Sequence, residues 1–401
     1  MLITQEEVQM NELDHHYTTS FQEVEVATKK DNYKFEGVAA FVYQATMESD
    51  ANNKTVTVVG PGIPGIVPLH RIYFGKNRID HFFTINQQEA DQAVQDGGLY
   101  EGVACYVASV PLQFQAGWKI CVKCGSLGFS HLSDGVCATG GSHKLLSLGF
   151  PRYSLSFGDI PASNNTQSGW LYCKNCQSLW YGGSSDSGGV CPAGGKHTSD
   201  GSGNYTLAHD IKANLGVTKW KWCNKCQGLW QDQTGFVPSK SSVSVNNVCP
   251  AGGGHDGLGS FNYRLISSRS VQPTMVPLYR LYQQSQNDHF YTTDINERNH
   301  AINIGYKDEG IACYVYPVVT QPKMETITTF YGPVPFWRIF QESKPSSDEG
   351  LTLSKVFRYI GVGVVVIGSA FFFGSDKKKC QVRKPDGSIV FYFCEDGPPN
   401  F

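Results

Sequence analysis

Three copies of one cysteine–histidine pattern occupy the middle of the chain and limit its possible folds more than any other feature. Each copy reads C-x2-C, a loop of 12, 14 or 22 residues, and then C-x5-H. Two short ligand pairs joined by a free loop have the spacing of a tetrahedral Cys3His zinc site. The predicted ligands are Cys121, Cys124, Cys137 and His143; Cys173, Cys176, Cys191 and His197; and Cys223, Cys226, Cys249 and His255. The pattern therefore predicts three zinc ions in three small modules.

These ions are expected to be structural. A module of roughly 35 to 45 residues has too small a core to be stable without a metal or another staple. Catalytic zinc usually keeps one position open beside three protein ligands, whereas every copy here offers four. Disulfide bonds are the alternative, but the odd number of three cysteines per copy argues against them.

Tryptophans recur around the predicted ligands. Trp118, Trp170 and Trp220 each precede the first cysteine of a copy by three residues, and we expect them to cover the small core beside the metal. Trp180 and Trp230 follow the second cysteine, and Tyr181 adjoins Trp180. An exposed ring beside polar Gly, Ser and Asn loops suits a sugar face, so these last three are candidate carbohydrate contacts. The alternative is that they also cover the core.

A different repeat flanks the modules on both sides. VPLHRIYFGKNRIDHFFT at 67–84 matches VPLYRLYQQSQNDHFYT at 276–292, and each leads to an apolar EGxACYV segment. The N-terminal DHHYT and FEGVAAFVY segments repeat the later parts of this unit. Ser20, Asn86 and Asp294 each stand three residues before a glutamate, which is a capping-box signature. The pattern predicts strand, strand, short helix and strand in every unit.

A fourth, degenerate unit is predicted near the C-terminus. VPFWRIFQ at 334–341 matches the opening of the repeat, and the apolar segment 360–373 falls where the closing strand belongs. A membrane span is the alternative for 360–373, but its 14 residues fall short of the roughly 20 that a bilayer requires. Beyond it, Cys380 and Cys394 flank a Pro-Asp-Gly turn. This predicts a β-hairpin with a candidate disulfide between the two cysteines.

The predicted fold is β-rich α+β, with four strand–strand–helix–strand repeats interrupted by three small Cys3His modules and followed by a C-terminal β-hairpin. The two repeat pairs are expected to pack together as one domain. The predicted boundaries are 1–110 for the first pair, 117–266 for the modules (117–157, 169–208 and 219–266), 275–370 for the second pair and 376–401 for the tail.

Asp-His pairs recur in the flanking units and could belong to a ligand site. Asp80, His81, Asp288 and His289 are the candidates, and Asp14-His15 is a third copy of the pair. The alternative is an internal hydrogen-bond network in each unit. The sequence contains no G-x-S-x-G, HExxH, P-loop or Rossmann motif, which favours a protein that is not an enzyme.

Charge and composition argue against several partners. The formal net charge is −2 and 17% of residues are charged, and few Lys or Arg lie near the predicted ligands. Nucleic acid is therefore not expected as a partner. No signal peptide is visible at the N-terminus, which fits a cytoplasmic or non-classically released protein and leaves the compartment open.

The flanking unit resembles a short repeat of unknown function in bacterial and fungal proteins, found beside hydrolases or as lectin-like domains. The metal modules are similar to uncharacterised Cys/His-rich, zinc-ribbon-like repeats. These resemblances imply an accessory binding role. Our leading hypothesis is a non-enzymatic, multivalent protein that binds carbohydrate or a cell surface. The alternative is a structural, self-assembling protein whose repeats and apolar C-terminal tail contact other copies of the chain.

Overall fold

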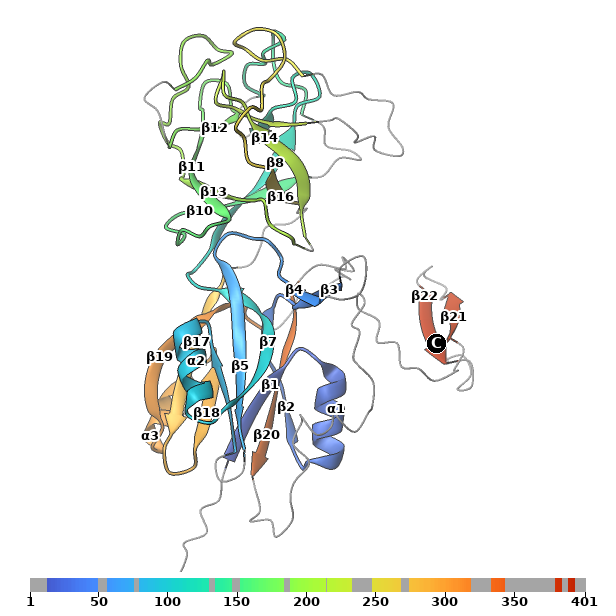
Figure 1. Ribbon diagram of the computed structural model, residues 1–401, viewed down its shortest axis with the longest axis vertical. Helices are drawn as coiled ribbons and strands as arrows, with labels where there is room; N and C mark the ends of the chain where they lie inside the picture. Colours follow the sequence, from blue (N-terminus) through green and yellow to red (C-terminus); the bar gives the residue numbers. More distant parts are fainter. Residues whose placement is uncertain are drawn as a thin grey trace, which may run out of the picture.

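The chain forms two bodies stacked along its long axis, a base and a head (Figure 1). The base comprises the flanking repeats, and the head comprises the three Cys/His modules. The computed structural model describes residues 13–49, 56–75, 79–129, 134–145, 152–183, 188–213, 215–232, 247–267, 274–318, 333–342, 379–383 and 389–393.

Two units of the base have the predicted order of elements. The second unit contains β5 (Ile66–Phe74), β6 (Asp80–Thr84), α2 (Gln87–Gln95) and β7 (Leu99–Ala108). The third contains β17 (Val276–Gln283), β18 (Asp288–Thr292), α3 (Ile295–Asn303) and β19 (Lys307–Val315). In both, the opening strand lies between the other two and pairs antiparallel with each. Because β7 and β19 also pair, the six strands form one sheet, which curls into a half-barrel.

The first unit is completed by a strand from the far end of the chain. It contains β1 (Leu13–Thr18), α1 (Phe21–Lys30) and β2 (Lys34–Val42). Strand β20 (Val334–Glu342) lies between β1 and β2, where β5 and β17 lie in their own units.

This arrangement corrects the prediction of a fourth unit. The opening strand assigned to that unit instead fills the slot between β1 and β2, where Phe336 and Ile339 are 1% and 0% exposed. The position between β1 and β2 favours this strand because the facing edges of β1 and β2 both need a partner and the surface beneath them is apolar. The predicted closing segment, 360–373, lies outside the described residues. Among the helices that the structure describes, none is long and apolar enough to cross a membrane.

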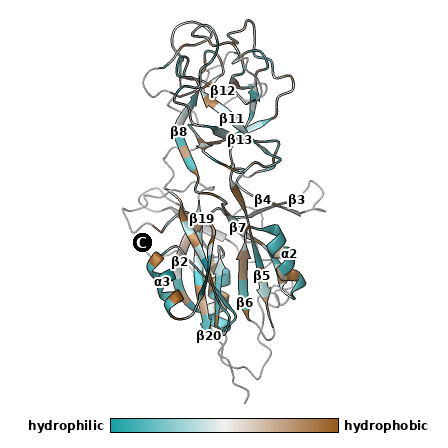
Figure 2. Cartoon of the chain, turned by 90° about the vertical axis from the view of Figure 1, so that its left-hand side faces the viewer, coloured by the Kyte–Doolittle hydropathy of each residue, from teal (hydrophilic) through white to brown (hydrophobic). Residues whose placement is uncertain are grey.

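The helix caps are confirmed. The side chains of Ser20, Asn86 and Asp294 each accept a hydrogen bond from the backbone of the first helical turn. The helices cover the outer side of the strands, and α2 and α3 lie on opposite sides of the base (Figure 2). Gly305 follows the end of α3 with φ +103°, a conformation that favours glycine.

The head is a ring of three modules whose strands form a nearly closed barrel. Each module contributes a long strand, a short strand paired with it, and a third strand that follows the metal ligands. These strands are β8 (Gln113–Ile120), β9 (Leu127–Phe129), β10 (Tyr153–Phe157), β11 (Thr166–Tyr172), β12 (Leu179–Tyr181), β13 (Tyr205–His209), β14 (Val217–Trp222), β15 (Leu229–Gln231) and β16 (Tyr263–Ser267).

The head core includes one tryptophan and one tyrosine from each module, packed with leucine and isoleucine side chains. Trp118, Trp170 and Trp220 are fully buried, which confirms their predicted core position. Each tryptophan packs edge to face on a tyrosine of a neighbouring module, with ring centroids 5.0 to 5.3 Å apart. The pairs are Trp118 with Tyr205, Trp170 with Tyr263 and Trp220 with Tyr153.

Two short hairpins complete the described structure. Strands β3 (Thr46–Ser49) and β4 (Val56–Val59) pair beside the base, and β21 (Lys379–Arg383) pairs with β22 (Ile389–Phe393). Cys380 lies opposite Tyr392 in the register of the second hairpin. Cys394 lies outside the described residues, so the disulfide remains a prediction. The β-rich fold class is confirmed.

Candidate functional site

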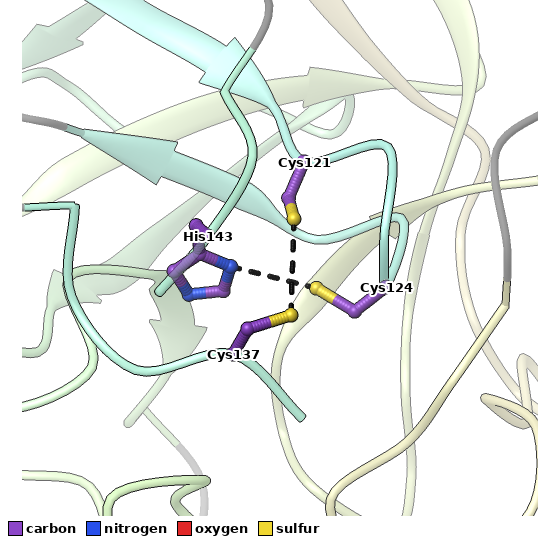
Figure 3. Close-up of side chains that lie close together, drawn as sticks. All are labelled: Cys121, Cys124, Cys137 and His143. Atoms are coloured by element: carbon purple, nitrogen blue, oxygen red, sulfur yellow. Dashed lines mark hydrogen bonds between the residues drawn. The ribbon is translucent and has the colours of Figure 1, made fainter. Parts of the chain in front are cut away.

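The three predicted ligand sets come together as buried Cys3His groups. In the first, Cys121 Sγ lies 3.9 Å from Cys137 Sγ, and Cys124 Sγ lies 3.6 Å from His143 Nδ1 (Figure 3). The same separations are 3.9 and 3.4 Å in the second group and 3.8 and 3.5 Å in the third. A tetrahedron with Zn–S bonds of about 2.3 Å and a Zn–N bond of about 2.0 Å requires roughly 3.8 Å between two sulfurs and 3.5 Å between sulfur and nitrogen. The four donors of each group therefore fit a zinc ion, and these sulfurs are too far apart to be bonded to one another.

The local sequence shapes each group for a metal. In the second module, Gln177 N–H donates to Cys173 O and closes the C-x2-C turn, and Gln177 has φ +59°. The paired glycines before the histidine also have positive φ, 98° at Gly194 and 68° at Gly195. This turn lets Cys191 N–H donate to Gly195 O at 3.0 Å, and both other modules repeat that hydrogen bond. Ligand spacing and glycine position together preorganise the site.

The free nitrogen of one ligand connects two modules. His143 Nε2 lies 3.0 Å from Cys176 O and 3.1 Å from Ser178 Oγ, both in the second module. A partner on the second ring nitrogen fixes the orientation of a metal-ligating histidine. The first metal group is thus joined to the second module through its histidine.

Trp180 and Trp230 are buried, whereas a sugar contact requires an exposed ring. Their rings stack on His197 and His255 with centroids 5.4 Å apart in both cases, and each tryptophan is only 6% exposed. The rings form a wall of the metal site because the short strands that carry them run directly from the C-x2-C turn. Tyr181 is partly exposed and packs on Trp170.

The Asp-His pairs of the base join different units. Asp14 of the first unit accepts hydrogen bonds from His81 N–H at 3.0 Å and from His81 Nδ1 at 2.7 Å. Asp80 of the second unit pairs in the same way with His289, at 2.9 and 2.7 Å. Asp288 of the third unit pairs with His15, again at 2.9 and 2.7 Å. One oxygen from each aspartate lies within 4.8 Å of the other two. The candidate ligand residues Asp80, His81, Asp288 and His289 therefore belong to a buried cycle at the centre of the base.

Burial and charge oppose each other in this cycle. Burial raises the pKa of Asp14, but the charge and hydrogen bonds of His81 outweigh it and bring the pKa down to about 2. Burial likewise lowers the pKa of His81, and Asp14 reverses this so that the pKa is raised. The pKa of Asp80 is raised, chiefly by burial.

A second cycle surrounds the first and consists of arginine between two glutamates. In each case one glutamate belongs to the arginine's own unit, and the other is the capping-box glutamate of the preceding unit. The closest ion-pair contacts are Arg71 to Glu101 (2.9 Å) and Glu23 (3.2 Å), Arg280 to Glu309 and Glu89 (both 2.8 Å), and Arg338 to Glu36 (2.8 Å) and Glu297 (2.9 Å). The recurrence of these residues is visible in the sequence, but their pairing across units is not.

We call the boundary between two units a seam, and the first, second and third seams contain Arg71, Arg280 and Arg338. The three seams differ in how deeply their glutamates are buried. The side chains of Glu23 and Glu101 at the first seam are 8% and 7% exposed, whereas Glu89 and Glu297 at the other seams are 38% and 41% exposed. The first seam also contains His16, at the position of Phe82 and Phe290, with its ring 4.1 Å from that of His81. Burial and the neighbouring His81 lower the pKa of His16 to about 4.

The comparison with known families concerns the base. A family model described as a domain of unknown function, DUF5648, matches residues 7–108 and 257–344. The base is similar to DUF5648. The two matched segments include every strand and helix of the three units, so the interruption by the head falls inside the matched domain. Searches of curated proteins and of solved structures gave no significant match.

Proposed function

We propose that this chain is a non-enzymatic, multivalent binding protein with three structural zinc ions, and that it binds carbohydrate at a cell surface. Four protein ligands at each metal site favour a closed, structural ion. The Asp, His, Arg and Glu side chains that recur in the base are engaged with one another across the seams. Neither arrangement is typical of a reaction centre.

The observation that carries the proposal is that the base presents three related outer faces. We define the outer face of a unit by the first residue of its helix, the ring before the arginine of its opening strand, and the residue before the glutamate of its closing strand. The faces are Phe21, Trp337 and Phe35 in the first unit; Gln87, His70 and Tyr100 in the second; and Ile295, Tyr279 and Asp308 in the third. Surfaces at equivalent positions allow one chain to contact a partner at more than one point, and linked contacts raise the overall affinity.

The second outer face combines the two chemistries that a sugar requires. Tyr100 is 43% exposed, and its hydroxyl lies 2.9 Å from Nδ1 of His70, which is itself buried, so the tyrosine hydroxyl is the polar atom that this pair presents at the surface. An apolar ring face beside polar atoms can cover the C–H surface of a sugar and hydrogen-bond its hydroxyls. This face supports carbohydrate as the ligand class.

A glycan array with the zinc-loaded chain tests the proposal. We expect binding at micromolar protein that weakens about tenfold in Tyr100→Ala, since a buried aromatic contact contributes about 1–2 kcal/mol. Leu99→Ala is the matched control, because Leu99 is 49% exposed and adjoins Tyr100 on the same strand. Absence of binding, together with large oligomers in light scattering, would reject the proposal and favour the self-assembling alternative.

A further inference from the structure

The outer face of the first unit carries three aromatic rings, Phe21, Trp337 and Phe35, which we call the aromatic platform. Phe21 and Phe35 are 55% and 50% exposed, and Trp337 is partly exposed. The ring of Trp337 lies between the two phenylalanines, with centroids 5.5 Å from Phe21 and 5.7 Å from Phe35. Exposed apolar clusters of this kind mark binding surfaces more often than isolated apolar residues do.

The third unit shows what the equivalent position accepts. Tyr279 stands before Arg280 as Trp337 stands before Arg338, so the two rings occupy the same place in their units. The guanidinium of Arg298 lies over the Tyr279 ring, 4.9 Å from its centroid. Asp308, at the position of Phe35, pairs with that guanidinium. The third outer face is thus already covered by a cation from its own helix.

The first unit lacks that internal cation but keeps a more favourable ring. The residue at the position of Arg298 is Val24, which is buried in the core beneath α1. Tryptophan attracts a cation more strongly than tyrosine does, and additional aromatic rings beside it strengthen the attraction. Glu25 lies one helical turn after Phe21, but its carboxylate pairs with Lys29 at 3.2 Å, so the aromatic rings carry the attraction for a cation here.

We propose that the aromatic platform binds a quaternary ammonium group of the choline type, held over the ring of Trp337. Such a cation is bulky, weakly hydrated and unable to donate hydrogen bonds, so aromatic faces recognise it better than carboxylates alone do. This binding is separate from the proposed carbohydrate site on the second unit, and each can fail without the other.

Titration of the zinc-loaded chain with choline, followed by the indole N–H signals of the tryptophans in NMR, tests the platform. We expect the Trp337 signal to shift with choline and not with neohexyl alcohol, its uncharged carbon isostere. Phe21→Ala and Phe35→Ala should each weaken choline binding about two- to fivefold, the range for exposed cation–π contacts. Ile295→Ala is the matched control, because Ile295 is the equivalent of Phe21 in the third unit and is 45% exposed.

Trp337→Ala should abolish the binding, but this variant also removes packing on the helix. The two phenylalanine variants therefore decide the outcome, since both residues are half exposed. The proposal is overturned if choline and the alcohol bind equally, if choline shifts no tryptophan signal, or if Ile295→Ala weakens binding as much as Phe21→Ala. A shift of Trp337 with neutral sugars and not with choline would also overturn it.

Discussion

Head and base are both rings of three repeats, but they are closed by different means. In the head the three modules follow one another in sequence, and each contains its own group of four donors suited to a metal ion. In the base the first unit becomes complete only when β20 returns from the far end of the chain, and ion pairs connect every unit to the next. A metal site stabilises a module through residues that are close together in the sequence. The base instead depends on contacts between segments that are far apart in the sequence.

Metal removal should produce the largest difference in stability between the head and the base. We expect a chelator to unfold the head and leave the base folded, because structural zinc contributes about 10–16 kcal/mol in small zinc domains. Hydrogen exchange should show lost protection around Trp118, Trp170 and Trp220 and retained protection in β5 and β7. Metal analysis of the untreated chain should give three zinc ions per molecule.

Cysteine variants provide the control for metal removal. Cys176→Ser should lower the zinc content by one ion, whereas Cys105→Ala, at an equally buried cysteine in the base core, should not change it. A gently purified chain with almost no zinc and with oxidised cysteines would contradict the metal assignment.

Truncation at β20 should have the opposite effect. A chain ending at Gly332 lacks β20, and we expect its base to unfold while the head remains folded. The truncation removes Phe336 and Ile339 from the core, and losing two such side chains costs about 5–10 kcal/mol, comparable with the whole stability of a domain. Hydrogen exchange in β1 and β2 measures the loss.

A chain ending at Glu342 is the matched control, because it keeps β20 and lacks only the residues that follow it. We expect this chain to keep the protection of β1 and β2. Addition of a peptide with the sequence of β20 should restore the shorter chain. Full protection of β1 in the shorter chain without the peptide would show that the first unit does not need this strand.

These two bodies also show which features a sequence can predict. Ligand spacing, helix caps and strand patterns depend on neighbouring residues, so the twelve metal ligands and the caps at Ser20, Asn86 and Asp294 were predictable. The partners of a strand depend on the whole chain. The segment 334–341 has the pattern of an opening strand, and nothing in it distinguishes a fourth unit from the missing strand of the first. The Trp180 and Trp230 rings stack on His197 and His255 of their own modules, but the residue pattern does not show whether a ring beside polar loops turns toward the metal group or toward the surface.

The seams of the base should differ in their sensitivity to loss of arginine. Arg71→Ala leaves Glu23 and Glu101 almost fully buried without their cation, and breaking a buried pair in this way costs about 3–5 kcal/mol. Arg280→Ala leaves Glu89 and Glu309, which are 38% and 22% exposed and which water can solvate, so we expect a loss of about 1–2 kcal/mol. Urea unfolding of both variants measures the two losses. Equal losses would show that burial does not distinguish the seams.

The last expected effect is a dependence of stability on pH at the first seam. Since the pKa of His16 falls from 6.5 to about 4 on folding, its contribution to stability is present above pH 6.5 and is lost as the pH falls toward 4. The pKa of His81 is raised, so its contribution is present below pH 6.5 and is lost as the pH rises through its folded value. Together, the two histidines make the contribution of this seam to stability greatest near pH 6.5.

Replacing His16 with phenylalanine, the residue at the equivalent position of the other two seams, tests how much of the stability lost below pH 6.5 is due to this histidine. His16→Phe should lose less stability than the natural chain between pH 6.5 and 4, by up to about 3 kcal/mol at the acidic end. Phe82→His is the matched reverse change, and it should make the second seam sensitive to acid. Urea unfolding at several pH values measures both variants. If His16→Phe and the natural chain lose stability in parallel below pH 6.5, then the acid sensitivity of the base arises from the carboxylates of the seams, which all three seams share, and not from the one histidine that distinguishes the first.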